Sequence, residues 1–118
     1  MITGAHIVLF TKDAEGLRSL FREVLGFSSV DAGGGWLIFA LPPSELAAHP
    51  TDGKGHHELY LMCDDVHATV AELKDKGVEL RRQVSDEGFG LVTSIELPGG
   101  EELGLYEPRH PSPLTPAR

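Results

Sequence analysis

The joint between a strand and a helix in residues 55–66 decides the fold, and this segment reads GHHELYLMCDDV. Leu59, Leu61 and Cys63 form one wholly apolar face, as expected of a strand that packs under a helix. Asp65 is placed to cap a helix whose apolar positions follow at helical spacing. The segment therefore predicts a strand that enters a helix through a short capped turn.

The first half of the chain has the same order of elements. An apolar run at residues 5–11 predicts a strand, Asp13 is placed to cap a helix, and Gly26 is placed to end it. Beyond the helix, a glycine triplet favours a hairpin, and a proline pair breaks the pattern before a last short segment. The strands predicted for this region cover residues 28–32, 36–41 and 44–48.

The second half repeats this order, with a helix that ends at Gly77 and further predicted strands. Such self-similarity predicts two tandem βαβββ modules in one α+β domain, with a mixed sheet curled around a cleft. After Glu107 the chain carries four of its eight prolines, which predicts a flexible tail. The predicted boundaries are 3–50 and 56–108 for the modules, 1–108 for the domain and 109–118 for the tail, and the later strands cover 78–84, 91–97 and 102–106.

Composition excludes several classes of partner. A formal net charge of −8 disfavours nucleic acid and favours cationic partners, and no apolar run approaches the roughly 18 residues that a membrane helix needs. The start of the chain lacks the pattern of a secretory signal, and the single cysteine, Cys63, agrees with a reducing compartment. We therefore expect a cytoplasmic protein that binds neither nucleic acid nor a membrane.

Five short motifs occur along the sequence in a fixed order. They are HIVLF at 6–10, EVLGF at 23–27, CDDV at 63–66, LPGG at 97–100 and LGLYEP at 103–108. Together they resemble the vicinal oxygen chelate superfamily, which includes glyoxalase I, extradiol dioxygenases and bleomycin-binding proteins. The resemblance covers residues 3–108 and implies paired modules, often completed by a domain-swapped homodimer. It also implies a cleft in which strands one and four of each module bind a divalent metal, here Fe, Mn, Ni or Zn.

The resemblance, together with side-chain alternation, identifies three candidate metal ligands. His6 occupies the first-strand position, and Glu58 mirrors it because both precede their helix cap by seven residues. Alternation also places Glu58 on the cleft face, where it is the candidate catalytic group, whereas His57 shares the helix side. Glu45 aligns with the carboxylate that glyoxalase I places on its fourth strand, although a solvated loop glutamate is an equal alternative.

One family position is vacant. Where the enzymes carry a glutamate, this chain has Gly104, which offers no side-chain donor. The sequence still favours a divalent-metal enzyme, a lyase, isomerase or extradiol-type dioxygenase, that acts on a small molecule with vicinal oxygens. The alternatives are a metal-free binding protein for a drug or cationic ligand, favoured by Gly104, and an accessory module with a vestigial cleft. The residues predicted to line the pocket are Tyr60, Met62, Trp36, Phe89 and Tyr106.

Overall fold

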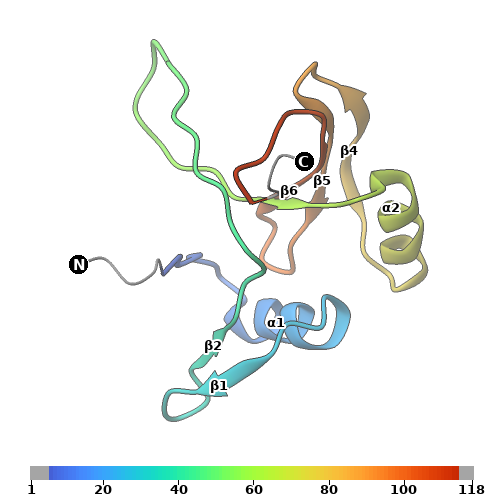
Figure 1. Ribbon diagram of the computed structural model, residues 1–118. Helices are drawn as coiled ribbons and strands as arrows, with labels where there is room; N and C mark the ends of the chain where they lie inside the picture. The colour runs from blue at the N-terminus through green and yellow to red at the C-terminus, as the bar shows by residue number, and fades with distance from the viewer. Residues whose placement is uncertain (1–5, 115–118) are drawn as a thin grey trace.

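The computed structural model describes residues 6–114, and Figure 1 shows its two parts. The first part begins with helix α1 (Ala14–Ser19), which continues into a π-helical turn, η1 (Leu20–Val24). An antiparallel hairpin of β1 (Ser29–Asp31) and β2 (Leu37–Phe39) follows. A long connection without regular structure then leads to the second part (Figure 1).

The second part is the βαβββ unit that the sequence predicts. It consists of β3 (Tyr60–Met62), α2 (Val66–Asp75), β4 (Leu80–Asp86), β5 (Gly90–Glu96) and β6 (Glu102–Pro108). The sheet order is β3-β6-β5-β4, with β3 parallel to β6 and the other pairs antiparallel. The α+β fold class is confirmed, and β3 and β4 form the two edges of this sheet.

The predicted helix boundaries are confirmed by their hydrogen bonds and glycine geometry. Asp13 Oδ1 accepts a hydrogen bond from Gly16 N at 2.9 Å, and Asp65 Oδ1 accepts one from Ala68 N at 3.1 Å. Gly26 and Gly77 follow the helices with φ of 73° and 84°, a conformation that favours glycine. Each helix therefore begins and ends where the local sequence directs.

The hydrophobic core lies between one face of the four-stranded sheet and both helices. Leu17 and Leu20 of the first helical segment join Leu73 of α2 in a single buried cluster with residues of β5 and β6. The first helix therefore packs on the sheet of the second module, beside α2. The other buried residues of this cluster, from β5, β6 and the turn between them, are Ile95, Leu97, Leu103 and Leu105.

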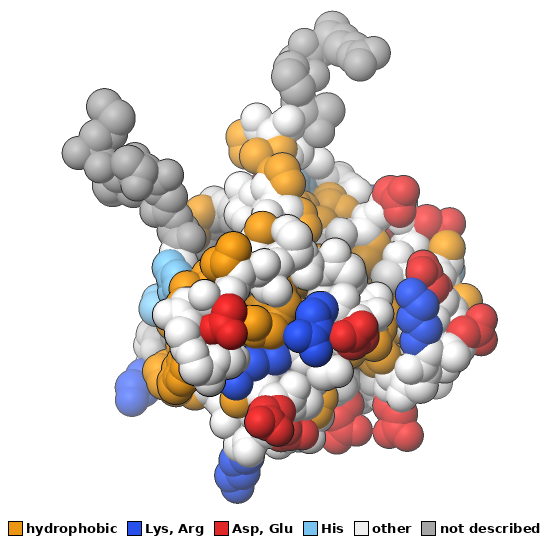
Figure 2. Space-filling view, turned by 90° about the horizontal axis from the view of Figure 1, so that it is seen from below, with side chains coloured by type: hydrophobic (Ala, Val, Ile, Leu, Met, Phe, Trp, Pro, Cys, Tyr) orange, Lys and Arg blue, Asp and Glu red, His pale blue; other side chains and the backbone are white. Residues whose placement is uncertain are grey.

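Two predicted strands do not form. Residues 6–11 and 44–48 have no strand structure, and Ala5, the first residue of the first predicted strand, lies outside the described residues. A strand needs a hydrogen-bonded neighbour, and neither segment has one among the described residues. Leu9 packs partly against the core, but Phe10 and Leu46 remain in solvent, 90% and 99% exposed. Among the described residues, the first module therefore has two strands and not four. Figure 2 shows hydrophobic side chains on the surface of one face of the molecule.

Within residues 6–114, no helix combines the length and the apolarity needed to cross a bilayer. The cytoplasmic location stays a prediction.

Candidate functional site

The side-chain phase of β3 is the one the sequence predicts. Leu59, Leu61 and Cys63 pack against the hydrophobic core, whereas Tyr60 and Met62 lie on the opposite face, 37% and 38% exposed. Strand alternation turns Glu58 to the same side as Tyr60, and the Tyr60 hydroxyl donates a hydrogen bond to Glu58 Oε1 at 3.1 Å. This face of the sheet carries the candidate site.

The ring of Tyr60 fills the space beside Gly104 on the neighbouring strand. The two residues are direct partners in the parallel pairing of β3 with β6. A Cβ added at Gly104 would lie 2.2 Å from Cδ1 and 2.5 Å from Cε1 of Tyr60, far inside van der Waals contact. At the position where the resemblance implies a glutamate ligand, an aromatic ring thus occupies the space that a side chain would need.

A second tyrosine lies near a glycine one strand further. A Cβ at Gly90 of β5 would lie 2.5 Å from the Glu107 carbonyl oxygen and 3.2 Å from Cδ2 of Tyr106, so the β6 backbone and the Tyr106 ring both approach this glycine. Tyr106 contacts both neighbouring rings edge to face, with centroids 5.8 Å from Tyr60 and 6.0 Å from Phe89. We call Tyr60, Met62, Phe89 and Tyr106 the aromatic surface.

Each tyrosine of the aromatic surface is hydrogen-bonded to a carboxylate. Tyr60 donates to Glu58, and the Tyr106 hydroxyl donates to Glu45 Oε1 at 3.3 Å. Burial raises the pKa of both tyrosine hydroxyls above the ordinary value, and the neighbouring carboxylate adds to each shift. Both phenols therefore remain protonated donors at neutral pH.

A charged cluster borders the aromatic surface at the other end of β6. Glu102 Oε1 accepts hydrogen bonds from Arg82 Nε at 3.0 Å and from the buried Ser94 Oγ at 2.6 Å. The Ser94 hydroxyl, followed by Arg82, holds the pKa of Glu102 below its ordinary value. The carboxylate is therefore ionised at neutral pH, and it already has its partners within the sheet.

The remaining predicted site residues lie elsewhere in the chain. His6 is exposed in the extended segment before α1. Trp36 is 70% exposed on the β1–β2 hairpin, where the Arg18 guanidinium lies 5.3 Å from its ring centroid. Of the predicted pocket, the structure brings together Tyr60, Met62, Phe89 and Tyr106, while Trp36 is on another sheet.

The donor set of one chain does not fit a divalent metal. Among residues 6–114, no three His, Cys, Asp or Glu side chains are grouped as ligands, so His6, Glu45 and Glu58 stay a predicted set. Gly104 supplies no donor, and the Tyr60 ring fills the space beside it. The Glu45 carboxylate is engaged by its own neighbours, because it accepts hydrogen bonds from Tyr106 and Ser112.

Two residues at this site escaped sequence analysis. His110 stacks on Tyr106, and Ser112 Oγ donates a hydrogen bond to Glu45 Oε2. The prolines around both residues predict a flexible tail, so the sequence gives no indication that His110 and Ser112 contact the site. The only sequence signal is their place directly after the last strand, which carries Tyr106.

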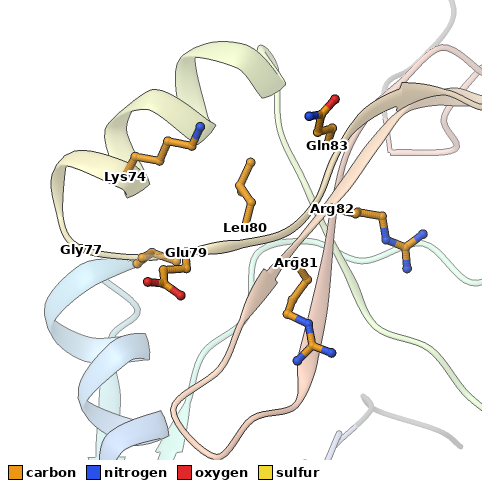
Figure 3. A pocket seen from close by; sticks show the side chains of 8 residues that line it. Lys74, Gly77, Glu79, Leu80, Arg81, Arg82 and Gln83 are labelled. Atoms are coloured by element: carbon orange, nitrogen blue, oxygen red, sulfur yellow. The ribbon is translucent and has the colours of Figure 1, made fainter.

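A groove of about 690 Å³ lies on the other side of the molecule, between the end of α2 and β4 (Figure 3). Its rim includes Lys74 and Glu79, while Arg81 and Arg82 turn away from α2. Both arginines form ion pairs with carboxylates of the sheet, Arg81 with Glu96 at 3.6 Å and Arg82 with Glu102 at 2.5 Å. The groove therefore offers few free charges.

Comparison with known proteins identifies relatives of this fold. An antibiotic binding protein from Streptomyces sp. CB03234 is 26% identical, with 92% of this chain and 99% of that chain covered and a TM-score of 0.62. A glyoxalase/bleomycin resistance protein from the same organism is 25% identical over 82% of this chain and 93% of that chain, with a TM-score of 0.57. A lactoylglutathione lyase from Agrobacterium tumefaciens, 14% identical over 89% of this chain and 92% of that chain, shares the fold with a TM-score of 0.65. No curated protein matches the chain.

The family model of the Glyoxalase/Bleomycin resistance protein/Dioxygenase superfamily matches residues 4–108. The match spans nearly the whole chain and agrees with the βαβββ unit seen in the second part. The chain therefore belongs to the Glyoxalase/Bleomycin resistance protein/Dioxygenase superfamily.

Proposed function

We propose that this protein binds a flat, positively charged aromatic molecule on the aromatic surface without using a metal. The observation that carries the proposal is the Tyr60 ring against Gly104, since a stacking group stands where a metal-binding carboxylate would be needed. The alternative weighed from the sequence, a metal-free binding protein, thus becomes the first candidate, ahead of the metal enzyme.

The chemistry of the surface defines the ligand class. Phe89 is 45% exposed, and Tyr60 and Met62 are more than one-third exposed, so flat apolar groups are open to a ligand. Carboxylates of Glu45 and Glu58 lie at the tyrosine hydroxyls, and the chain carries a net charge of −8. Aromatic rings beside carboxylates favour a planar cation, through stacking and cation–π attraction together.

The antibiotic binding protein from Streptomyces supports this choice, because it is 26% identical and is aligned over nearly its whole length. That protein binds an antibiotic. For this chain we propose the same general role, the capture of a small molecule.

A metal-dependent enzyme is the second candidate, and one observation favours it. Glu58 and Glu45 are linked through two tyrosines whose ring centroids are only 5.8 Å apart, so two predicted ligands share one region of the sheet. A histidine from a second chain would complete a three-ligand site, and a bound divalent ion would supply Lewis-acid activation of substrate oxygens.

Metal dependence separates the two candidates. Protein purified without a nickel column and treated with EDTA should bind proflavine, a flat cationic acridine, with the Kd of the untreated protein, measured by fluorescence titration. Atomic emission should find no stoichiometric Fe, Mn, Ni or Zn in the untreated sample. Proflavine binding that is lost with EDTA and restored by one of these metals would favour the enzyme instead.

We also propose that the protein works as a homodimer. Ile7, Val8 and Phe10 of the segment before α1 are apolar, yet they are 47%, 57% and 90% exposed. Among the described residues, β3 is an edge strand that pairs with β6 alone. A second copy would cover both.

Sedimentation velocity should find a dimer in the wild type and a shift toward monomer in Phe10→Asp. Phe10 is 90% exposed in one chain, and a carboxylate there would have to be desolvated in the interface, so we expect the dimer Kd to rise at least about tenfold. His67→Asp adds the same charge to an exposed position of α2 and should leave the dimer intact. A wild-type protein that remains monomeric at high micromolar concentration would contradict the proposal.

A further inference from the structure

Glu45 is an exception within the long connection between β2 and β3. Every residue from 40 to 58 is exposed except Glu45, whose side chain is only 14% exposed. Its neighbour Leu46 is 99% exposed, so the segment as a whole does not pack on the molecule. Glu45 alone is covered, and part of what covers it is the chain that follows β6.

The covering groups are polar and come from one short stretch. Ser112 Oγ donates a hydrogen bond to Glu45 Oε2, and the Tyr106 hydroxyl donates one to Oε1 at 3.3 Å. His110 Nε2 lies 3.7 Å from the same Oε1 and 3.3 Å from the Tyr106 hydroxyl oxygen. The Glu45 carboxylate thus has three partners, of which His110 and Ser112 belong to the tail.

The imidazole of His110 lies on the aromatic surface as a bound ring would. It stacks on Tyr106 with the centroids 6.0 Å apart and an interplanar angle of 28°. His110 Nδ1 is 2.7 Å from the Pro111 carbonyl oxygen, which can only accept, so Nδ1 carries a proton. The ring thus donates to this carbonyl, and its Nε2 edge faces the Glu45 carboxylate.

The tail is attached more firmly before His110 than after it. Arg109 N donates a hydrogen bond to the Phe89 carbonyl at 2.8 Å, and its guanidinium lies 3.3 Å from Asp86 Oδ2. Beyond this point, residues 110–112 contribute no buried apolar side chain. Hydrogen bonds and ion pairs at such partly exposed positions are individually weak, so this part of the tail is readily displaced.

We propose that His110 occupies the ligand subsite of the free protein, and that the ligand displaces it with a planar ring whose cationic or N–H edge faces Glu45. This inference rests on the proposed function and specifies it, because it names the stacking partner and the carboxylate that the ligand takes over. The tail acts as an internal competitor. The measured affinity for a ligand is the intrinsic affinity reduced by the fraction of chains whose tail is docked.

Removal of the competing ring should strengthen binding. Fluorescence titration with proflavine should give a Kd about threefold to tenfold lower for His110→Ala than for the wild type, as expected if docking is worth about 1 kcal/mol. His67→Ala removes an exposed histidine from α2 on the helix side and should leave the Kd unchanged. Glu45→Gln added to His110→Ala should cancel the gain, because the ligand loses its charged partner. Binding by His110→Ala that equals or falls below the wild type would overturn the inference.

NMR provides a readout of the tail that does not depend on dye fluorescence. The His110 ring signals, assigned by their loss in His110→Ala, should be shifted by the Tyr106 ring in the free wild type and should move to the positions of an exposed histidine with saturating proflavine. Proflavine binding that leaves these signals in place overturns the inference but keeps the proposed function. A lack of proflavine binding in the wild type and in every variant overturns both.

Discussion

Gly104→Ala should destabilise the protein by about 1–3 kcal/mol and weaken proflavine binding by about tenfold, although alanine is normally better than glycine inside a strand. The reason is the Tyr60 ring, whose Cδ1 atom would lie 2.2 Å from the new Cβ. The ring must leave its place on β6, and its edge-to-face contact with Tyr106 is then lost. Urea denaturation and fluorescence titration of the same samples measure the two effects.

A double-mutant cycle separates this contact from general effects on the strand. In a Tyr60→Ala background, Gly104→Ala should be neutral or should stabilise the protein by up to about 1 kcal/mol, because only the strand preference for alanine remains. Gly104→Ala that is equally destabilising with and without the Tyr60 ring would show that the ring is not what requires glycine.

The second βαβββ unit could be predicted because its signals are local. The alternation in residues 58–63 places Leu59 and Leu61 under the helix, and Asp65 caps α2 as its position indicates. The turn glycines adopt the positive φ that their position in the pattern requires. The strand period, the helix cap and the residue that ends the helix are each set by a few neighbouring residues, so the sequence of one chain is enough to identify them.

The first module was predicted less well, because a strand also depends on its partner. Residues 6–11 and 44–48 have suitable apolar side chains, but no strand pairs with them among the described residues. An apolar pattern indicates that a segment can pair with another strand, but it does not identify that strand. We find no signal in residues 20–24 for the π-helical turn that continues α1.

The vacancy at Gly104 was visible in the sequence, but its physical reason was not. The pairing of Tyr60 with Gly104 follows from the register of β3 on β6, which is a contact between residues 44 positions apart. The position of His110 is a similar case, since it depends on a loop carboxylate 65 residues earlier. Composition alone predicted a flexible tail, whereas residues 109–112 contact the aromatic surface and Glu45.

Tyr106→Leu should produce the largest loss of ligand binding, because Tyr106 contacts Tyr60, Phe89 and His110 and is the centre of the aromatic surface. Loss of one stacking and cation–π partner is worth about 1–2 kcal/mol, which corresponds to a rise in Kd of about fivefold to thirtyfold. Tyr106→Phe keeps the ring and removes only the hydroxyl, so its Kd should stay within about threefold of the wild type.

Isothermal titration calorimetry of proflavine with these two variants and the wild type, all in EDTA, tests the central claim most directly. The account predicts saturable binding to the wild type and Tyr106→Phe, and binding at least about fivefold weaker to a folded Tyr106→Leu. Wild-type protein that binds no proflavine in EDTA, or a Tyr106→Leu variant that binds it as tightly as the wild type, would contradict a metal-free site on the aromatic surface.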